Sequence, residues 1–322
     1  MTMKNEIPVI ETVHLKKYFK TPKGMLHAVD DINLRIMAGE TLGVVGESGC
    51  GKSTLGSTII RLNEPDGGDI LFKGKSTIGL RGRESKEMRT KMAMIFQDPY
   101  SSLNPRMTVL DQIADPMRVN RKFRTKQERY ERAAELMDIV GLASRVAGSY
   151  PHELDGGRRQ RIGVARALAL DPEFIVCDEP VSALDVSIQA QILNLLMDLQ
   201  DELGLSYLFI THDMSVVRHI SNNIMVAYLG QCVEYADRAR MFENPCHPYT
   251  KALLSAIPEP TLEARHKKVE LLKGEIGNAI DPVPGCRFAG RCPHCMTECR
   301  QANIPGFEVE PGHTVNCLLY QK

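Results

Sequence analysis

The sequence has 322 residues, with 40 Lys and Arg against 40 Asp and Glu, so its formal net charge is zero. Its 43% of apolar residues are typical of a globular chain of about two domains, which excludes disordered, collagen-like and coiled-coil proteins. The balanced charge also argues against a protein that binds nucleic acid through overall positive charge.

Hydropathy and cysteine content bear on the compartment. No run reaches the roughly 18 consecutive apolar residues of a membrane-spanning helix, and the first residues lack the apolar core of a secretory signal. We therefore expect a protein of the reducing cytosol that reaches a membrane only by docking on another protein. In that compartment nine cysteines are poor evidence for disulfides. Five of them crowd between Cys286 and Cys317, which requires a separate explanation.

The N-terminal part of the chain has a β pattern that gives way to a helix. Alternating apolar and polar residues predict half-buried antiparallel strands at 9–13 and 27–36. A wholly apolar run at 42–46 predicts a buried strand that ends in glycine, and a helical pattern begins near Lys52. The order strand, loop, helix is therefore expected here.

The middle of the chain is helical and then alternates. Helix formers dominate from about 108 to 169. Short apolar runs at 174–177 and 207–210 predict buried strands, with helices expected at 188–203 and after Asp213. The sequence thus predicts an α/β core with a parallel sheet and a helical insertion.

The composition of the sequence changes after Phe242. Prolines, glycines and cysteines interrupt every apolar run from there on. We place a domain boundary near Glu243. Residues 1–243 then form the first domain, with a helical subdomain at about 100–169, and residues 244–322 form a smaller one.

A phosphate-binding loop is expected between the strand at 42–46 and the helix that follows. Its residues match the pattern G-x-x-x-x-G-K-[ST] in the context that this pattern requires. Glycines let backbone N–H groups turn inward around phosphates, Lys52 supplies a point charge, and the Ser53 hydroxyl suits Mg²⁺. Cys50 is interpreted as a small filler rather than a nucleophile, although a helix N-terminus would lower the pKa of its thiol. The expected ligands are Gly46, Ser48, Gly49, Cys50, Gly51, Lys52, Ser53 and Thr54.

Two acidic residues follow the apolar run at 174–177. Asp178 stands where a carboxylate binds the Mg²⁺ shell, and Glu179 stands where it orients or deprotonates an attacking water. Phosphate loop and acid pair together predict a nucleotide hydrolase.

At this point the sequence resembles the ATP-binding subunits of ABC transporters over essentially residues 8–245. The match lies in short motifs in that family's order. Gln97 resembles the glutamine that contacts metal and nucleotide, Asp185 belongs to a segment resembling the D-loop, and His212 resembles the switch histidine near the γ-phosphate. Phe19, or less favourably Tyr18, resembles the aromatic residue that stacks on adenine. The resemblance implies ATP with Mg²⁺, held in part by Ser53, Gln97 and Asp178, and a fold of RecA-like core, antiparallel β lobe and helical lobe.

The family's signature loop is Leu-Ser-Gly-Gly-Gln, and this chain departs from it. Gly156 and Gly157 are kept, but Asp155 replaces the serine. A serine hydroxyl donates to a phosphate oxygen, whereas an ionised Asp only accepts and repels negative charge. Asp is also a good helix N-cap, so the change costs little in folding. Because signature loops act on the partner's nucleotide, we expect a heterodimer with unequal ATP sites; the alternative is that Asp155 turns away from phosphate and is tolerated.

The segment from Asn244 closely resembles the HPYT stretch that opens the C-terminal extension of peptide-transporter ATPases. Downstream, four cysteines are spaced Cys286-x₅-Cys292-x₆-Cys299-x₁₇-Cys317, with Cys295 between them. Four thiolates from loops suit an iron–sulfur cluster or tetrahedral zinc, and reduced thiols buried as small hydrophobes are a further alternative. The resemblance implies a [4Fe–4S] cluster of structural role on Cys286, Cys292, Cys299 and Cys317, with Cys295 leaving that choice open.

The resemblance also implies the function. An ATPase of this kind powers the import of peptides and is a peripheral protein at the cytoplasmic face of the cell membrane. It works with a second homologous ATPase, two transmembrane permease subunits and an extracytoplasmic peptide-binding protein. No nucleic acid takes part. Three alternatives stay open. They are an importer ATPase for nickel or another small solute, an ABC-type ATPase acting on DNA or ribosomes, and a regulatory subunit that binds ATP without productive hydrolysis.

Overall fold

The computed structural model describes residues 7–257 and 277–321, so part of the expected C-terminal extension, 258–276, lies outside the described residues. Two compact units make up the chain, and neither is continuous in sequence. The first comprises Met1–Ile10, Ile36–Glu40 and Phe72–Leu208; the second comprises Glu11–Arg35, Thr41–Leu71 and Phe209–Lys322. The boundary that the sequence suggests near Glu243 stays a prediction.

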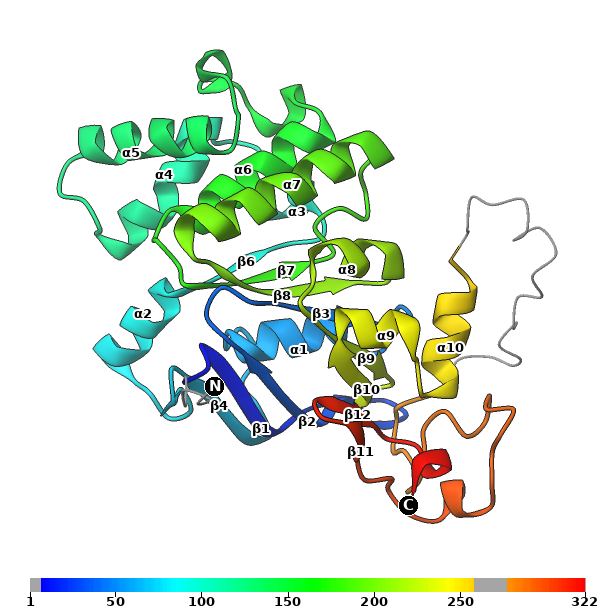
Figure 1. The fold of residues 1–322 in the computed structure, drawn as a ribbon. Coiled ribbons are helices and arrows are strands. Elements are labelled where there is room, and N and C mark those ends of the chain that lie inside the picture. Colours follow the sequence, from blue (N-terminus) through cyan, green and yellow to red (C-terminus); the bar gives the residue numbers. More distant parts are fainter. Residues whose placement is uncertain (1–6, 258–276, 322) are drawn as a thin grey trace, which may run out of the picture. The chain divides into compact units, whose positions relative to one another are not determined.

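The first unit is mainly helical around parallel strands (Figure 1). Strands β6 and β7 pair in parallel, with Met92 opposite Phe174 and Ile95 opposite Cys177, and the order within the unit is β8-β7-β6. Of β8 (Ser206–Thr211), residues 206–208 belong to this unit. The elements are β5 (Lys75–Ser76), α2 (Gly82–Thr90), β6 (Met92–Ile95), α3 (Pro99–Ser102), α4 (Val109–Asn120), α5 (Lys126–Ile139), α6 (Gly156–Leu168), β7 (Phe174–Asp178) and α7 (Val186–Leu203), with single 3₁₀ turns at Ser144–Val146 and Pro151–Glu153.

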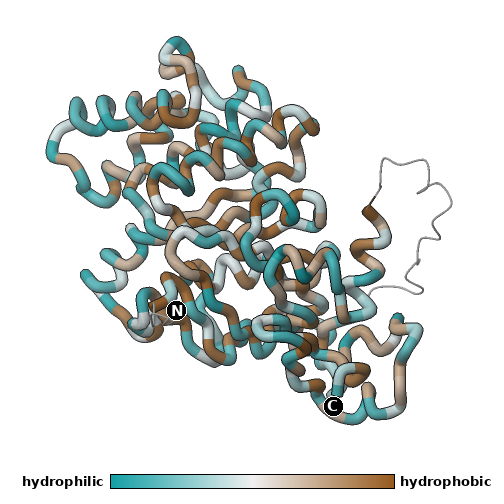
Figure 2. The backbone as a smooth tube through the Cα atoms, viewed as in Figure 1, coloured by the Kyte–Doolittle hydropathy of each residue, from teal (hydrophilic) through white to brown (hydrophobic). Residues whose placement is uncertain are grey.

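Local sequence signals explain these helices. Thr125 and Glu128 form a capping box at the start of α5, because the side chain of each accepts the backbone N–H of the other. At the start of α4, the Thr108 side chain accepts the backbone N–H of Asp111. Buried residues such as Leu136 and Met117 recur at helical spacing, and Figure 2 shows teal and brown segments alternating along α4 and α5. The helical insertion that the sequence predicts is therefore confirmed.

The second unit combines two sheets. One carries β2-β1-β4; a two-residue connection joins β1 and β2, which only antiparallel neighbours allow. The other has the order β11-β12-β10-β9-β3, parallel between β3 and β9 and antiparallel elsewhere. Its elements are β1 (Ile10–Thr21), β2 (Gly24–Ile36), β3 (Thr41–Val45), α1 (Lys52–Ile59), β4 (Gly67–Phe72), α8 (Met214–Ile220), β9 (Asn223–Tyr228), β10 (Gln231–Asp237), α9 (Arg238–Glu243), α10 (Pro248–Ser255), β11 (Phe307–Glu310) and β12 (His313–Val315), with 3₁₀ turns at Glu298–Arg300 and Leu318–Tyr320.

Three aromatic rings join the C-terminal segments to the core of this unit. Tyr228 of β9, Tyr249 of α10 and Phe288 are each at most 1% exposed. Their ring centroids lie 4.7 Å (Tyr228–Tyr249), 5.3 Å (Tyr228–Phe288) and 5.4 Å (Tyr249–Phe288) apart, mostly edge to face. They pack with Val226 of β9 and with Val45, at the end of β3 that leads into the phosphate loop. The C-terminal residues described here are thus part of the core of the second unit rather than an appendage.

A buried carboxylate fastens the same segments. Glu234 of β10 is 0% exposed and accepts the backbone N–H of Cys246 at 2.7 Å and that of His247 at 2.8 Å. It also bonds Nε2 of the equally buried His313 at 2.8 Å. Glu234, Cys246 and His313 are the one group of three metal-ligand side chains within 4.8 Å among the described residues, and hydrogen bonds already account for their proximity.

The expected strands and helices are confirmed, with boundaries within a few residues of those predicted, except that the strand expected at 9–13 continues to Thr21 as β1. None of the helices in the described part of the chain combines the length and the hydropathy that crossing a bilayer requires.

Candidate functional site

The phosphate loop lies between β3 and α1, as predicted. Gly51 precedes α1 with φ of 99°, in the left-handed region, and a Cβ there would lie 1.9 Å from the Ala28 carbonyl oxygen. Only glycine fits this position. No side chain caps α1, and a helix N-terminus without a side-chain cap is an arrangement suited to an anion.

Lys52 is 4% exposed and closes the loop from inside. Its Nζ donates to the carbonyl oxygens of Gly46 at 2.8 Å and Glu47 at 3.0 Å. Cys50 is also buried, and here the sequence-based expectation is wrong: burial raises the pKa of its thiol, although the Lys52 charge opposes this. Cys50 is therefore a packed neutral thiol, which agrees with its interpretation as a filler.

Two neighbouring aromatic residues of β1 differ in whether their rings are available to stack on a bound base. Tyr18 stacks on His27, with ring centroids 4.0 Å apart, and its hydroxyl donates to Asp30 at 2.5 Å. Phe19 has a half-buried ring with Lys17 Nζ 5.2 Å from its centroid. Because the Tyr18 ring already has a stacking partner, Phe19 is the better candidate for a bound base.

The acid pair lies in the first unit, where β7 ends. Asp178 is 7% exposed, and Glu179 has a φ of 44°, a left-handed conformation that is costly for a residue with a side chain. Gln97 Nε2 donates to Glu179 Oε2 at 2.9 Å. The structure therefore brings together two of the three residues predicted to be catalytic.

The segment resembling the signature loop forms the start of α6. Asp155 is its N-cap, with Oδ1 accepting the backbone N–H of Arg158 at 2.8 Å and Oδ2 lying 3.4 Å from the Arg158 guanidinium. The capping role expected from the sequence is confirmed. The two glycines are tightly packed: a Cβ on Gly156 would lie 3.1 Å from Leu184, and one on Gly157 would lie 2.7 Å from Ile188.

The remaining predicted residues flank helix starts. Asp185 caps α7, its Oδ1 accepting the N–H of Ile188 at 3.0 Å, so the segment resembling the D-loop packs beside the signature glycines. His212 directly follows β8 and is exposed. His212 and the phosphate loop belong to the second unit, whereas Gln97, Asp178, Glu179 and Asp155 belong to the first.

Residues that sequence reasoning missed surround the phosphate loop. The backbone N–H of Glu47 donates to the Tyr249 hydroxyl at 2.8 Å, and the Glu47 carboxylate receives two N–H groups of Arg291 at 2.6 and 3.0 Å. Arg287 pairs with Asp30. The available signal was two arginines between cysteines, but their partners are more than 240 residues away in the chain.

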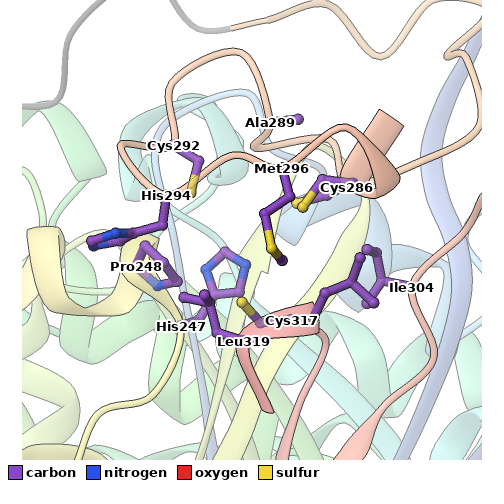
Figure 3. A pocket seen from close by; sticks show the side chains of 12 residues that line it. His247, Pro248, Cys286, Ala289, Cys292, His294, Met296, Ile304, Cys317 and Leu319 are labelled. Atoms are coloured by element: carbon purple, nitrogen blue, oxygen red, sulfur yellow. The ribbon is translucent and has the colours of Figure 1, made fainter. Parts of the chain in front are cut away.

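The four spaced cysteines line one cavity in the second unit (Figure 3). The sulfurs of Cys286, Cys292 and Cys317 point toward a common space, which the Met296 thioether also enters. The space left is about 10 Å³, roughly one water molecule. Cys295 does not line it. The lining comprises His247, Pro248, Cys286, Ala289, Cys292, His294, Met296, Cys299, Ile304, Cys317, Leu318 and Leu319.

Burial keeps three of the cavity thiols neutral. It raises the pKa of Cys286 to about 11 and raises the pKa values of Cys292 and Cys317 above their usual range. His247 is neutral too, because burial lowers its pKa to about 4. A metal-bound state of these thiols therefore requires the loss of their protons. The other cysteines expected to be structural, Cys177, Cys232 and Cys246, have raised pKa values for the same reason.

Comparison with known folds defines the class of protein. Residues 29–182 match the ABC transporter family. The ATP-binding cassette MJ0796, solved as a dimer in a post-hydrolysis state with ADP and Pi, is 30% identical, with a TM-score of 0.65 over 71% of this chain and 98% of that one. The cbiO1 structure from Clostridium perfringens has the same TM-score at 27% identity, over 74% of this chain and 92% of that one. The fold is that of an ABC-type ATPase.

Longer matches narrow the family. Residues 233–299 match the oligopeptide/dipeptide transporter C-terminal region. The oligopeptide transport ATP-binding protein OppF of Bacillus subtilis (strain 168) is 56% identical over 311 residues, 96% of this chain and 96% of that protein. Its namesake in Salmonella typhimurium is 50% identical over 305 residues, 94% and 91% respectively. The chain therefore belongs to the oligopeptide and dipeptide branch of the ABC transporter ATP-binding proteins.

Proposed function

We propose that this chain powers the import of peptides by hydrolysing ATP at the cytoplasmic face of the cell membrane. The observation that carries the proposal is the pairing of a phosphate loop closed by Lys52 with a C-terminal region of the peptide-transporter type packed around that loop. Relatives of 50% identity and more carry the words oligopeptide transport in their names.

Each predicted residue has a role in this proposal. Lys52 and the loop N–H groups bind the β- and γ-phosphates, and Phe19 stacks on adenine. Ser53, Gln97 and Asp178 hold Mg²⁺, which supplies charge neutralisation at the phosphates. Glu179 accepts a proton from the attacking water, and the Gln97 amide at 2.9 Å orients its carboxylate. His212 and Asp185 contact the γ-phosphate region.

A groove in the first unit supports docking of a membrane subunit. It has a volume of about 250 Å³. Met94 and Phe96, which directly precede Gln97 in the sequence, are among the residues that line it. Phe96 is 38% exposed, so part of its apolar ring is available to a partner. We propose that a cytoplasmic helix of a permease subunit occupies this groove. The full assembly then contains this chain, a second ATPase, two permeases and an extracytoplasmic peptide-binding protein.

Reconstitution tests the proposed function. The assembled transporter in proteoliposomes is expected to accumulate a labelled peptide only with ATP, and Glu179→Gln is expected to stop both uptake and hydrolysis. Lys251→Gln, which changes an exposed side chain of α10, is the control. Uptake of nickel but not of peptide would contradict the peptide cargo and identify the chain as an importer ATPase for a small solute. ATP-dependent binding to nucleic acid or ribosomes without permeases would overturn the transport function.

We further propose a heterodimer with unequal ATP sites. Its support is Asp155, whose carboxylate stands at the helix start where the family has serine and is held there by the N–H of Arg158. A fixed negative charge at this point weakens contact with the partner's nucleotide. Asp155→Ser in the reconstituted pair is expected to raise ATP turnover several-fold, with Thr125→Ser, a change in the cap of α5, as the control. Unchanged turnover would show that the carboxylate is simply tolerated.

We propose that the cysteine cavity holds a [4Fe–4S] cluster with a structural role. Cys286, Cys292, Cys299 and Cys317 line the cavity and Cys295 does not, which supports the choice of four ligands. Tetrahedral zinc would draw its sulfurs to about 3.8 Å, yet no three of these sulfurs lie within 4.8 Å of one another in the described structure, which favours a larger group. Met296, which is 37% exposed, is the side chain that must move.

Elemental analysis tests this assignment. Anaerobically purified protein is expected to contain iron and acid-labile sulfide in a ratio near one. The Cys292→Ser variant is expected to lose both, and the Cys295→Ser variant is expected to retain both. Zinc alone, or no metal, would contradict the cluster.

A further inference from the structure

Two arginines of the C-terminal region reach the phosphate loop and strand β2, which pairs with the strand that carries Phe19. Arg287 and Arg291 lie in the turn between Cys286 and Cys292, which we call the arginine turn. Their side chains are 6% and 9% exposed. Neither lines the cysteine cavity; each pairs instead with a carboxylate in the N-terminal part of the same unit.

Arg291 holds the phosphate loop. Its guanidinium donates two N–H groups to the carboxylate of Glu47, the second residue of that loop, at 2.6 and 3.0 Å. Such bidentate pairs fix orientation as well as charge. The backbone N–H of Glu47 donates to the Tyr249 hydroxyl, and its carbonyl oxygen accepts from Lys52. Glu47 is thus held at the side chain and at both backbone groups, in part by C-terminal residues.

The charge of Glu47 makes this contact matter for ATP. A carboxylate in the phosphate loop repels a triphosphate, and the repulsion is strong in a poorly solvated loop. Arg291 neutralises the carboxylate and keeps it turned toward the C-terminal region. Without Arg291, a negative charge stays beside the phosphates with no partner.

Arg287 holds the strand that carries the proposed adenine-stacking residue. It donates to Asp30 and to the carbonyl oxygen of Leu229. Asp30 in turn accepts the Tyr18 hydroxyl, and Tyr18 directly precedes Phe19. Burial alone would raise the pKa of Asp30, but the hydrogen bond from Tyr18 and the Arg287 charge hold it below its usual range, so the carboxylate is ionised and paired.

We propose that the arginine turn is a brace for the ATP site: Arg291 neutralises and positions Glu47, and Arg287 positions Asp30 and Tyr18 beside Phe19. Both arginines are positioning residues, and the inference rests on the proposed nucleotide site. Because five residues separate Cys286 from Cys292, a disturbance of the cysteine cavity moves both arginines and changes the affinity for ATP.

Nucleotide binding to the full chain tests the brace. We measure calorimetrically the Kd for ATPγS with Mg²⁺. We expect Arg291→Gln to raise the Kd about tenfold and Arg287→Gln about threefold. Arg291→Lys keeps the charge and is expected to stay within about threefold of the unsubstituted chain. Glu47→Gln combined with Arg291→Gln removes the unpaired carboxylate and is expected to recover most of the lost affinity.

A matched arginine separates this role from general stability. Arg240 of α9 pairs with Asp237 and Glu310 and bonds the Pro311 carbonyl, so it ties the C-terminal strand to the core without reaching a nucleotide loop. Arg240→Gln is expected to lower the melting temperature yet leave the Kd within about twofold. The cysteines offer a second pair: Cys292→Ser is expected to weaken binding and Cys295→Ser to leave it unchanged.

Arg291→Gln and Arg287→Gln variants that bind as tightly as the unsubstituted chain contradict the brace, as does a double variant no tighter than Arg291→Gln alone. Should Arg291→Gln not fold, Arg287→Gln against Arg240→Gln decides by the same criterion. Cys292→Ser binding equal to Cys295→Ser contradicts the link to the cavity. An unsubstituted chain that binds no ATPγS contradicts the proposed nucleotide site itself, which is a separate failure.

Discussion

The phosphate loop and the segment resembling the signature loop are both glycine-bearing helix starts, but they treat the helix N-terminus in opposite ways. At α1, Gly51 provides no side chain, so the helix start has no side-chain cap. At α6, Asp155 fills that position with its own carboxylate. One helix start thus suits an anion, whereas the other is satisfied by its own cap. The N-cap residues also differ in backbone, since Gly51 is left-handed with φ of 99° and Asp155 is extended with φ of −71°.

The largest effect is expected from removing the positive charge of the open loop. Lys52→Met keeps the apolar stem but loses the Nζ that closes the loop on two carbonyl oxygens. We expect ATP turnover of the reconstituted transporter to fall by at least about 100-fold. Lys251→Met at an exposed site of α10 is the control. Turnover within tenfold of the unsubstituted transporter would mean that the loop N–H groups bind the phosphates by themselves.

A methyl group in the open loop is expected to have the next largest effect. The Cβ of Gly51→Ala would overlap the Ala28 carbonyl and require a positive φ. We expect the free energy of unfolding to fall by about 3 kcal/mol, measured by urea denaturation. Gly49→Ala, with φ of 77° and no atom within 4 Å of its Cβ, is expected to lose about 1–2 kcal/mol. Equal losses would show that close approach to Ala28 does not constrain the loop.

The smallest effect is expected at the self-satisfied helix start. Asp155→Ala removes the acceptor for the Arg158 N–H and is expected to lower the free energy of unfolding by about 1 kcal/mol. Asp155→Ser keeps an acceptor and is expected to change it by less than about 0.5 kcal/mol. Thr125→Ala, the cap of α5, provides the reference for an ordinary cap. If Asp155→Ala is neutral, the carboxylate is not engaged with its own helix.

Local patterns predicted what local physics determines. Glycine spacing before Lys52 located the phosphate loop, and the chemistry of Asp155 predicted its capping role, because each depends on a few consecutive residues. The raised pKa of the Cys50 thiol escaped prediction, since the helix N-terminus is visible in the sequence but the depth of burial is not. Burial is a property of the whole second unit.

Contacts between segments that are distant in the chain could not be predicted from the sequence either. The cysteine spacing predicted a common site, and the structure places all four around one cavity. Nothing in the sequence pairs Arg291 with Glu47, because 244 residues separate them and many carboxylates offer equivalent partners. The buried acid Glu234 was equally hidden: its three donors come from segments after β10, and a strand pattern alone does not reveal a charged residue turned inward.

Glu234 also has a consequence for the order in which the second unit folds during synthesis. Its partner His313 lies 79 residues after it in the chain, so β10 is made long before His313 is added. Until then the carboxylate of β10 lacks one of its three donors, and a buried acid missing a donor is costly. The second unit is therefore expected to complete its core only once His313 has been made, and shorter nascent chains wait with this acid unsatisfied.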